Sequence, residues 1–571
     1  MCGIFSLLNY SSTNIIADKI EITTDFEKGS GRGPEHSTLD FDDQLNIVTG
    51  FHRLAINGLN EASNQPLRVA ERVAERVAER VAERVAERVK ERSENYSLIC
   101  NGEIYNYKQL YTLMGIVPTT GSDCEVIIHL YIRYGIEQTL RMLDGVFAFI
   151  LFCPNNIYVA RDPYGVRPLY YFNNDSQYNG VIGFTSELKT ICRLANQFNQ
   201  PVLQFTPGTF LTIDKTVNFE NVVWAIKNQK TYHIPAFALT HINDSKQDMY
   251  IDGINYHLKA AVTKRFITTE RPIACLLSGG LDSSLIAALV CEINKKENRE
   301  TGLCTIETYS IGLPDSEDIK FAKKVADHIG SKHTEIIVSE QDMLQIIPEV
   351  IKAIESYDTT TVRASIGNYL LGKYIKANSL AKVIFNGDGS DELAGGYLYM
   401  SSCPDSIEYE KETLRLLKDI HLFDVLRSDK CISSHGLEPR TPFLDRGFVN
   451  YYLSIPIEFR NHNLGRSIEK YLIRLAFSNE NLLPSEVLWR KKEAFSDGVS
   501  NKGKSLFQII QDYTDKQILD NSLNLKQKEK AFYKDIFDKT YPNQSHLVPY
   551  FWMPKYILSD DPSARTLANY K

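Results

Sequence analysis

The segment from 272 to 293, PIACLLSGGLDSSLIAALVCEI, restricts the fold more than any other part of the chain. A short apolar run from Ile273 to Leu277 leads into a turn of serine and glycine, and a helical pattern begins near Asp282. A second apolar run, AKVIFN at 381 to 386, follows a long helical stretch. Because strands that alternate with helices form parallel sheets covered by those helices, we predict an α/β domain in the C-terminal part.

The chain before residue 215 has a different pattern. Short β-rich stretches such as LDGVFAFILF (143 to 152) are separated by Gly, Asn and Pro, which predicts a layered β domain with a few helices. The stretch 215 to 248 is polar and irregular and is interpreted as a linker. A length of 571 residues exceeds what one hydrophobic core usually supports. We therefore expect two domains, at 2 to 214 and at 249 to 571.

Composition and charge exclude several classes of protein. The formal net charge of -7 is spread over the chain without a long basic block, so we expect neither nucleic acid nor a membrane as a partner. The N-terminus has no secretion leader, and no apolar run reaches membrane-spanning length. The 10 cysteines are scattered without a CxxC pair, which is typical of reduced thiols. These features predict a cytoplasmic enzyme that acts on small molecules and has no structural zinc.

A perfect repeat interrupts the first domain. VAER occurs five times from Val69 to Arg88, and VKER follows at 89 to 92. The repeat residues are good helix formers, but a period of four places like charges above one another. One hypothesis is a partner-binding helix over 69 to 92. We favour the other, a tandem expansion in a surface loop between two strands, because extra loop length is thermodynamically inexpensive.

The second residue is a candidate nucleophile. Removal of Met1 would leave Cys2 with a free α-amino group, so that the thiol and a base belong to one residue. An α-amine titrates near ~8 and a thiol near ~8.5, so the neutral amine is well matched to accept the thiol proton near physiological pH.

Several motifs of the first domain occur in a recognisable order: MCGIF at the start, FHRLAI at 51 to 56, NGEIYN at 101 to 106, SDCEVI at 122 to 127 and RDPYGVRPLYY at 161 to 171. Together they resemble the class II glutamine amidotransferases, which are N-terminal-nucleophile (Ntn) hydrolases. The resemblance implies an αββα sandwich, in which two antiparallel sheets lie between helices.

The same resemblance assigns roles to individual residues. Cys2 would attack the side-chain amide of glutamine, and Asn101 with the backbone N–H of Gly102 would form the oxyanion hole. Arg53 would bind the α-carboxylate and Asp123 the α-ammonium group of glutamine. Further family positions on the glutamine site are Leu54, Ile56, Asn57 and Glu103.

The turn LLSGGLDSSL, at 276 to 285, predicts a phosphate site. A turn between a strand and a helix points backbone N–H groups and the positive helix end at an anion. The turn lacks the GK[ST] of a Walker motif and resembles the SGGxDS loop of ATP pyrophosphatases, which transfer AMP to an oxygen nucleophile and release pyrophosphate. The positions that this resemblance places on ATP are Leu277, Ser278, Gly279, Gly280, Asp282, Ser283, Ile311, Asn386 and Gly387.

The resemblance also implies Mg²⁺, held by Asp282 and by Asp391 of NGDGSDE (386 to 392). Two carboxylates together with phosphate oxygens are a usual ligand set for this ion.

Further motifs of the second domain are YDTTTVRAS at 357 to 365, GSDELAGGYLY at 389 to 399, LEPRTPFLD at 437 to 445, IEKYLIR at 468 to 474 and KKEAFSDGV at 491 to 499. They resemble the asparagine synthetase family. By that resemblance Lys470 lies against the reacting phosphates and stabilises the adenylation or amide-forming transition state. Arg363 and Asp388 would contact the adenylate intermediate, with Arg363 a candidate for binding pyrophosphate or aspartate. Many relatives read SGEGSDE, whereas here Asn386 replaces Ser and the shorter Asp388 replaces Glu, which bears on how that intermediate is held.

The resemblance implies a ligase that converts ATP, aspartate, glutamine and water into AMP, diphosphate, asparagine and glutamate. Aspartate would pass through β-aspartyl-AMP, and ammonia through an internal channel. Two alternatives stay open: a related adenylating enzyme with another carboxylate acceptor, and a non-catalytic protein that uses the VAER helix as an interaction arm. The presence of Cys2, Arg53 and Asp123 speaks against the first. A homodimer is also left open.

Overall fold

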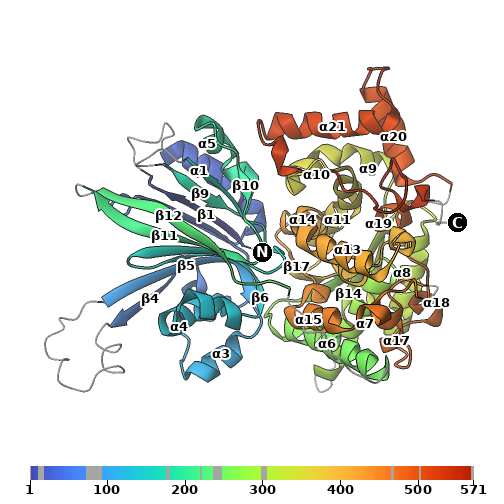
Figure 1. The fold of residues 1–571 in the computed structure, drawn as a ribbon, viewed down its shortest axis with the longest axis horizontal. Helices are drawn as coiled ribbons and strands as arrows, with labels where there is room; N and C mark the ends of the chain where they lie inside the picture. The colour runs from blue at the N-terminus through green and yellow to red at the C-terminus, as the bar shows by residue number, and fades with distance from the viewer. Residues whose placement is uncertain are drawn as a thin grey trace. The chain divides into compact units, whose positions relative to one another are not determined.

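The computed structural model describes residues 2–10, 19–72, 93–174, 180–218, 221–235, 247–297, 305–464, 468–500 and 503–567. The chain divides into two compact units, Met1–Ile234 and Pro235–Lys571. Figure 1 shows that long strands dominate the first unit and helices the second.

Within its described part, the first unit contains two six-stranded sheets in which all neighbouring strands are antiparallel. The strand order of one sheet is β10-β8-β9-β1-β3-β2, with bounds β1 Gly3–Leu8, β2 His36–Asp42, β3 Ile47–Arg53, β8 Tyr170–Asn173, β9 Ile182–Thr185 and β10 Leu203–Gln204. The order of the other is β12-β11-β7-β6-β5-β4, with bounds β4 Leu67–Arg72, β5 Ser93–Ile104, β6 Gly145–Phe152, β7 Asn156–Arg161, β11 Thr209–Asn218 and β12 Asn221–Thr231. The helices are α1 Lys19–Glu27, α3 Tyr107–Met114, α4 Val126–Met142 and α5 Cys192–Gln197.

The two sheets pack face to face, with helices outside. Ile150 of β6 belongs to the same apolar cluster as Phe51 of the facing sheet. Its neighbour Phe149 points the other way and packs with residues of α3 and α4. On the far side, Phe26 of α1 lies against Phe5 of β1, with ring centroids 5.8 Å apart. The predicted αββα sandwich is confirmed, and burial of both faces explains why β6 reads as a continuous apolar run.

The stretch 215–248 is not a linker throughout. Residues 215–218 continue β11, and Asn221–Thr231 form β12, which pairs with β11 along its length. The stretch is polar because β12 is the last strand of its sheet and mostly exposed, whereas Trp224 is buried. The predicted boundary was therefore placed too early. Residues 236–246 lie outside the described residues.

The first copy of the VAER repeat forms part of a strand and not a helix. Val69–Arg72 belong to β4, which pairs antiparallel with β5. Pairing with a neighbouring strand therefore overrides the intrinsic helix preference of these residues. The remainder of the predicted insertion, residues 73–92, lies outside the described residues and connects β4 to β5 in the chain.

The second unit contains a five-stranded sheet among its described residues, and all its strand pairs are parallel. The order is β15-β14-β13-β16-β17, with bounds β13 Ile273–Leu276, β14 Glu307–Gly312, β15 Lys332–Ile337, β16 Val383–Phe385 and β17 Glu438–Arg440. The helices are α6 Gln247–Ile267, α7 Leu281–Glu297, α8 Glu317–Ile329, α9 Glu340–Gln345, α10 Ile347–Ile354, α11 Thr359–Asn378, α12 Ser390–Ala394, α13 Ser406–Asp419, α14 Asp424–Ser433, α15 Arg446–Ser454, α16 Ile457–Arg460, α17 Tyr471–Ala476, α18 Ser485–Leu488, α19 Phe495–Gly498, α20 Leu506–Gln517 and α21 Leu525–Thr540. The predicted parallel α/β domain is confirmed.

The sheet places two turns side by side. Strands β13 and β16 are neighbours, with Cys275 opposite Phe385 in the register. Because parallel strands end at the same edge, the SGG turn after β13 and the NGDG turn after β16 meet there. Apolar residues of α11, such as Leu371 and Ile375, pack against one face of the sheet.

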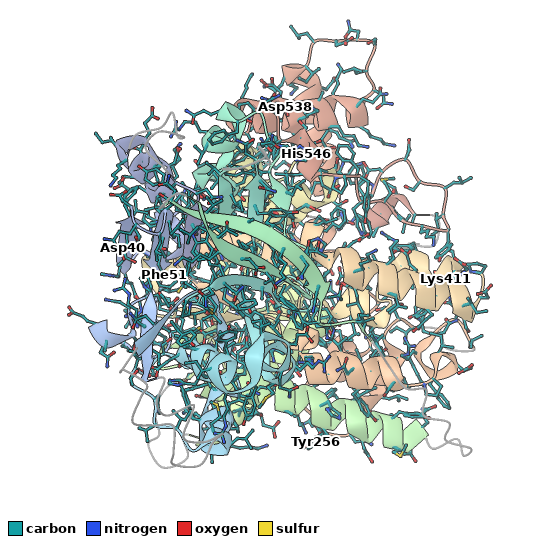
Figure 2. All side chains as sticks on the ribbon, turned by 60° about the vertical axis from the view of Figure 1, so that its left-hand side comes forward. Asp40, Phe51, Tyr256, Lys411, Asp538 and His546 are labelled. Carbon is teal, nitrogen blue, oxygen red and sulfur yellow. The ribbon has the colours of Figure 1, made fainter. Side chains whose placement is uncertain are left out.

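Side chains follow the expected division between core and surface (Figure 2). Phe51 is fully buried in the first unit, whereas Tyr256 on α6 is 68% exposed. No helix of the described ranges combines the length and apolar character needed to cross a membrane.

His435, just beyond α14, is a buried titratable group of the second unit. Its ring meets that of Tyr369 edge-on at 4.5 Å and packs against Gly372. Burial, assisted by the nearby charge of Lys376, lowers the pKa of His435 to about 4.

We predict that His435 makes the second unit acid-sensitive. Unfolded histidine binds a proton near pH ~6.5, but folded His435 does so only near its lowered pKa, so the unfolded state gains protons first as the pH falls. From pH 7.5 to 5.5 this group alone should remove about 1.4 kcal/mol of stability. Urea unfolding at both pH values should show a smaller loss for His435→Leu than for the wild type. An equal loss in the two proteins would contradict the prediction.

Candidate active sites

Cys2 directly precedes β1 in the first unit. Its Sγ lies 3.7 Å from the carbonyl oxygen of Leu54. Its own carbonyl accepts a hydrogen bond of 2.9 Å from Nε of Arg32, which also forms a buried ion pair of 2.8 Å with Glu187. The backbone of the thiol residue is thus fixed by a paired guanidinium group.

Asn101 is positioned by a serine that the sequence analysis did not identify. Nδ2 of Asn101 donates to Ser186 Oγ at 3.3 Å, and the same oxygen accepts from the backbone N–H of Ile4 at 3.1 Å. Ser186 therefore joins β5 to the strand that begins beside Cys2. Gly102 must be glycine, because a Cβ there would lie 2.5 Å from the carbonyl oxygen of Val146.

Arg53 is held by the loop that follows it. Its guanidinium group donates to the carbonyl oxygens of Asn60, at 3.0 Å, and of Gly58, and to Oδ1 of Asn64 at 2.7 Å. These bonds fix the direction of the positive charge.

The other residues predicted to surround glutamine are buried in the first unit. Asp123 accepts a bond of 2.6 Å from the backbone N–H of Ile104. Asn57 donates to Glu103 at 2.8 Å, so the residue pair is mutually satisfied. Leu54 and Ile56 are also buried.

Ser186 and Arg32 had weak sequence signals. Arg32 lies in the glycine-rich segment GSGRGP (29 to 34), and this spacing indicates a tight turn around a buried side chain. Ser186 lies between β9 and a short helical turn, and nothing in its local sequence separates it from other loop serines.

We predict that Ser186→Ala lowers glutamine hydrolysis by roughly tenfold, because one lost hydrogen bond frees the Asn101 amide from its fixed direction. Glutamate release from glutamine measures this. Ser6→Ala is the matched control, since the buried hydroxyl of Ser6 on β1 has no hydrogen-bond partner among the described residues. Equal rates for both variants would rule out the positioning role of Ser186.

In the second unit, the SGG turn is folded around two serines. Ser278 and Ser283 hydroxyls lie 2.9 Å apart, and Ser283 Oγ also accepts from the backbone N–H of Ser278 at 3.1 Å. Gly279 has φ of 75°, and a Cβ there would meet the backbone of α8. At Gly387 a Cβ would lie 2.7 Å from the backbone N of Ser283, so glycine is needed where the two turns approach each other.

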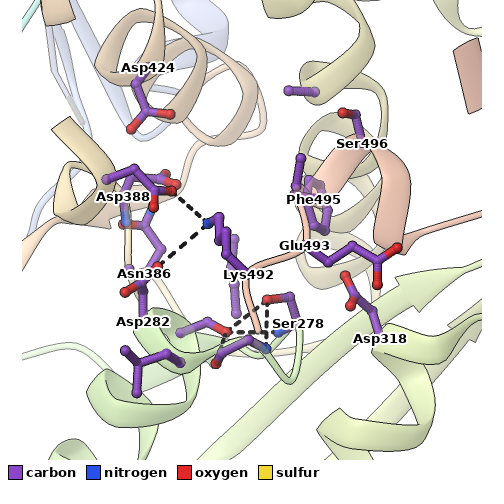
Figure 3. A pocket seen from close by; sticks show the side chains of 18 of the residues that line it. Ser278, Asp282, Asp318, Asn386, Asp388, Asp424, Lys492, Glu493, Phe495 and Ser496 are labelled. Carbon is purple, nitrogen blue, oxygen red and sulfur yellow. Dashed lines mark hydrogen bonds and ion pairs between the residues drawn. The ribbon is translucent and has the colours of Figure 1, made fainter. Parts of the chain in front are cut away.

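A pocket opens at this edge of the sheet (Figure 3). Of the residues predicted on ATP, the adenylate or the metal, it is lined by Leu277, Ser278, Gly280, Asp282, Ser283, Ile311, Asn386, Gly387, Asp388, Asp391 and Lys470. Gly279 is in the turn but does not line the pocket.

Two lysines and two aspartates form a charged cluster in the pocket. The ammonium group of Lys470 lies 2.6 Å from Asp282 and 2.5 Å from Asp391. Lys492 lies 2.6 Å from Asp391 and 3.7 Å from Asp282, and Figure 3 shows it among the labelled side chains of the pocket. The two carboxylates, from α7 and α12, thus face one point.

The cluster controls the charge of its members. Although burial raises the pKa of Asp391, Lys470 and Lys492 hold it well below its usual range. Burial lowers the pKa of Lys492, but the charges of Asp391 and Asp282 raise it by more than burial lowers it. The net pKa lies above its usual value, so the ammonium form is favoured. Lys492 therefore stays cationic, which suits the binding of phosphate.

Lys470 depends on a glycine opposite it. The residue has φ of 55° at the start of α17. A Cβ at Gly396 would lie 2.0 Å from Cε of Lys470 and 2.2 Å from Oδ1 of Asp391. Only a glycine leaves room for the ammonium group at this place.

Asp388 and Asn386 are tied to α14. Arg427 donates to Asp388 at 3.2 Å and also pairs with Asp424. Asn386 donates to Ser428 Oγ at 2.8 Å. Burial raises the pKa of Asp388, and Arg427 opposes that shift. The shorter carboxylate of this chain is thus drawn toward the guanidinium group.

Arg363 is not brought to the pocket, which contradicts its predicted contact with the adenylate. Its guanidinium group is buried and donates to Glu529 at 2.8 and 2.6 Å and to Asp561 at 2.8 and 3.0 Å. Four of the five N–H donors of the guanidinium group are thus taken by the two carboxylates. The residue instead ties α11 to α21 and to the C-terminal segment.

Several pocket residues were not predicted. Lys492 belongs to the quoted KKEAFSDGV motif and Arg490 directly precedes it, which was a usable signal for a basic site. Asp424 and Arg427 occur in an ordinary helical pattern that carries no local signal.

Comparison with known proteins bears on both units. The family model described as "Asparagine synthase" matches residues 253–409 and 402–556, and the "Glutamine amidotransferase domain" model matches residues 81–228. Proteins named "Asparagine synthetase [glutamine-hydrolyzing]" from Gallus gallus and Cricetulus griseus are 41% and 39% identical to the chain, and the Homo sapiens protein is 38% identical. Each alignment covers 100% of the chain and 99% of the relative. The chain belongs to the glutamine-hydrolysing asparagine synthetase family. The asparagine synthetase motifs quoted from the sequence agree with this membership.

We predict that Gly396→Ala weakens ATP binding by at least tenfold, because the added methyl group displaces the Lys470 ammonium group from the two carboxylates. Calorimetric titration with ATP measures the effect. Gly447→Ala is the control, since the nearest atom to its added Cβ is 3.2 Å away. Unchanged ATP affinity in Gly396→Ala would show that Lys470 does not act on the nucleotide.

Proposed function

We propose that the chain converts ATP, L-aspartate, L-glutamine and water into AMP, diphosphate, L-asparagine and L-glutamate. The observation that carries this proposal is the presence of two differently built centres in a chain related over its full length to glutamine-hydrolysing asparagine synthetases. One centre has a thiol at the start of β1, and the other has a glycine turn beside a cluster of lysines and aspartates.

In the first unit, Cys2 attacks the side-chain amide carbon of glutamine after removal of Met1. The α-amine accepts the thiol proton and returns it to the departing ammonia, which leaves a glutamyl thioester. Water then cleaves the thioester to give glutamate. Nδ2 of Asn101 and the N–H of Gly102 stabilise the oxyanion formed in both steps, and the bond from Asn101 to Ser186 supports the fixed direction of that amide.

The glutamine itself is bound by complementary charges. Arg53 takes the α-carboxylate and Asp123 the α-ammonium group, while Leu54, Ile56, Asn57 and Glu103 surround the side chain. The carbonyl partners of Arg53 and the backbone partner of Asp123 support this assignment, because they hold both charges in place.

In the second unit, the β-carboxylate of aspartate attacks the α-phosphorus of ATP, and diphosphate leaves. Ammonia then attacks the acyl carbon of β-aspartyl-AMP, and AMP departs with the bonding electrons. Backbone groups at Ser278, Gly279, Gly280 and Ser283 hold the phosphates, and Leu277, Ile311, Asn386 and Gly387 complete the nucleotide site. Lys470 neutralises charge that develops on the phosphates, which its position between Asp282 and Asp391 supports.

The site also fits Mg²⁺. Asp282 and Asp391 face one point, which the ammonium groups of Lys470 and Lys492 fill here. Among the described residues, no group of three side chains that could hold a metal ion occurs. Magnesium needs just such a pair of carboxylates together with phosphate oxygens. When bound with ATP, it would neutralise phosphate charge beside Lys470.

Asp388 takes the place of the family's longer carboxylate near the adenylate. Its bond to Arg427 keeps it at the pocket wall, while burial raises its pKa. A cytoplasmic location is part of the proposal, since the nine described cysteines are all free thiols. The homodimer stays a prediction.

The decisive experiment is an assay for pyrophosphate release that depends on aspartate, with glutamine and ammonium compared as nitrogen sources. We predict that Cys2→Ala abolishes the glutamine-dependent reaction and leaves the ammonium-dependent reaction near the wild-type rate, because the thiol acts only in hydrolysis. Mass spectrometry of the mature protein checks removal of Met1.

Two results would contradict the proposal. Loss of the ammonium reaction in Cys2→Ala would mean that the two centres are not separate. Pyrophosphate release with another carboxylic acid, but not with aspartate, would indicate a different acceptor.

A further inference from the structure

Arg490 holds the glycine turn through the turn's backbone. Its Nη1 donates to the carbonyl oxygen of Gly279 at 3.0 Å, and its guanidinium group lies 4.1 Å from the centre of the Phe321 ring. Phe321 in turn packs against Gly279, where a Cβ would lie 2.6 Å from Cβ of Phe321. Gly279 is therefore fixed at its carbonyl oxygen by Arg490 and at its Cα by Phe321.

The direction of one carbonyl decides the direction of the next N–H. In a planar trans peptide, the C=O of Gly279 and the N–H of Gly280 point in opposite directions. With the oxygen held by Arg490, the Gly280 N–H points toward the pocket side of the turn, where its nearest acceptor is Ser278 Oγ at 3.4 Å. Glycine at 279 and 280 would otherwise permit this peptide to rotate easily.

A chain of charges fixes Arg490. Its Nη2 contacts Asp318 at 3.0 Å and Glu493 at 3.2 Å. Figure 3 shows Asp318 and Glu493 close together at one side of the pocket. The other carboxylate oxygen of Glu493 accepts from Arg565 at 2.8 Å. Two arginines and two carboxylates thus alternate, so every charge in the chain is compensated.

Arg565 belongs to the C-terminal segment and does not line the pocket. It also donates to the carbonyl oxygen of Asp497 at 2.8 Å and to Ser500 Oγ at 3.3 Å. These bonds attach the segment to the residues around α19. Glu493 therefore stands between a pocket arginine and an arginine near the end of the chain.

We propose that Arg490 is a positioning residue that fixes the Gly279–Gly280 peptide with its N–H directed at a nucleotide phosphate, and that Arg565 braces it through Glu493. The inference rests on the proposed nucleotide site. It assigns to the C-terminal segment a part in phosphate binding, although the segment contributes no phosphate ligand of its own.

The test compares ATP with adenosine, which lacks phosphates, by calorimetric titration of the full-length protein. Arg490→Lys keeps the positive charge but loses the planar fork that reaches the carbonyl and the carboxylates together. It should weaken ATP binding about tenfold and leave adenosine binding unchanged. Arg565→Gln should weaken ATP binding about threefold, again without an effect on adenosine.

A matched control separates positioning from general loss of packing. Arg460 is buried and, like Arg490, donates to a carbonyl oxygen, that of Ile455, and to a carboxylate, that of Glu410, but it does not line the pocket. Arg460→Lys should leave both affinities unchanged. A double-mutant cycle adds a second readout: Glu493→Gln and Arg565→Gln should be non-additive for ATP, because each removes the same link.

Two outcomes would overturn the inference: ATP affinity unaffected by Arg490→Lys, or ATP and adenosine weakened equally. Its failure is distinguishable from failure of the proposed function. If the wild type binds ATP in an Arg490-dependent manner but releases no pyrophosphate with aspartate, the positioning role stands and the proposed reaction falls.

Discussion

The second unit depends on the parallel pairing of β13 with β16. That pairing places two turns from distant parts of the sequence at one edge of the sheet. Asp282 then faces Asp391, and like charges held so close require a cation between them. Lys470 and Lys492 supply it, and their charge makes the same place suitable for phosphate. The backbone arrangement thus brings two carboxylates together, and the lysines that neutralise them form the candidate site.

Close approach explains the glycines of this site better than flexibility does. Gly387 faces the backbone of α7, and Gly396 faces the side chain of Lys470. In both places a methyl group would occupy space that another functional group needs. Gly279 adds a second reason to close approach, because its positive φ is a conformation that other residues adopt at a cost. The site therefore combines two separate reasons for glycine within one pocket.

The first unit solves a simpler problem of positioning. Its two sheets bury their inner faces against each other, and the start of β1 pairs with β3 in a fixed register. Ser186 and Arg32 attach the active segment to the rest of this framework through hydrogen bonds to Asn101 and to the backbone of Cys2. A nucleophile at a chain end needs such attachments, because a terminus has few other contacts to order it.

The sequence by itself determined the two fold types and the glycine turn, and it predicted the nucleophile and eleven of the residues that line the pocket, because these are encoded in local patterns and in contiguous motifs. It did not determine the end of the first unit, because a polar outer strand and a linker have the same composition. It placed Arg363 wrongly, since the carboxylates that bind it, Glu529 and Asp561, lie more than a hundred residues away in the chain. Ser186 and the link from Arg490 to Arg565 were decided only by tertiary structure. Side-chain partners of this kind come from separate segments, and only the folded chain brings their atoms within hydrogen-bonding distance.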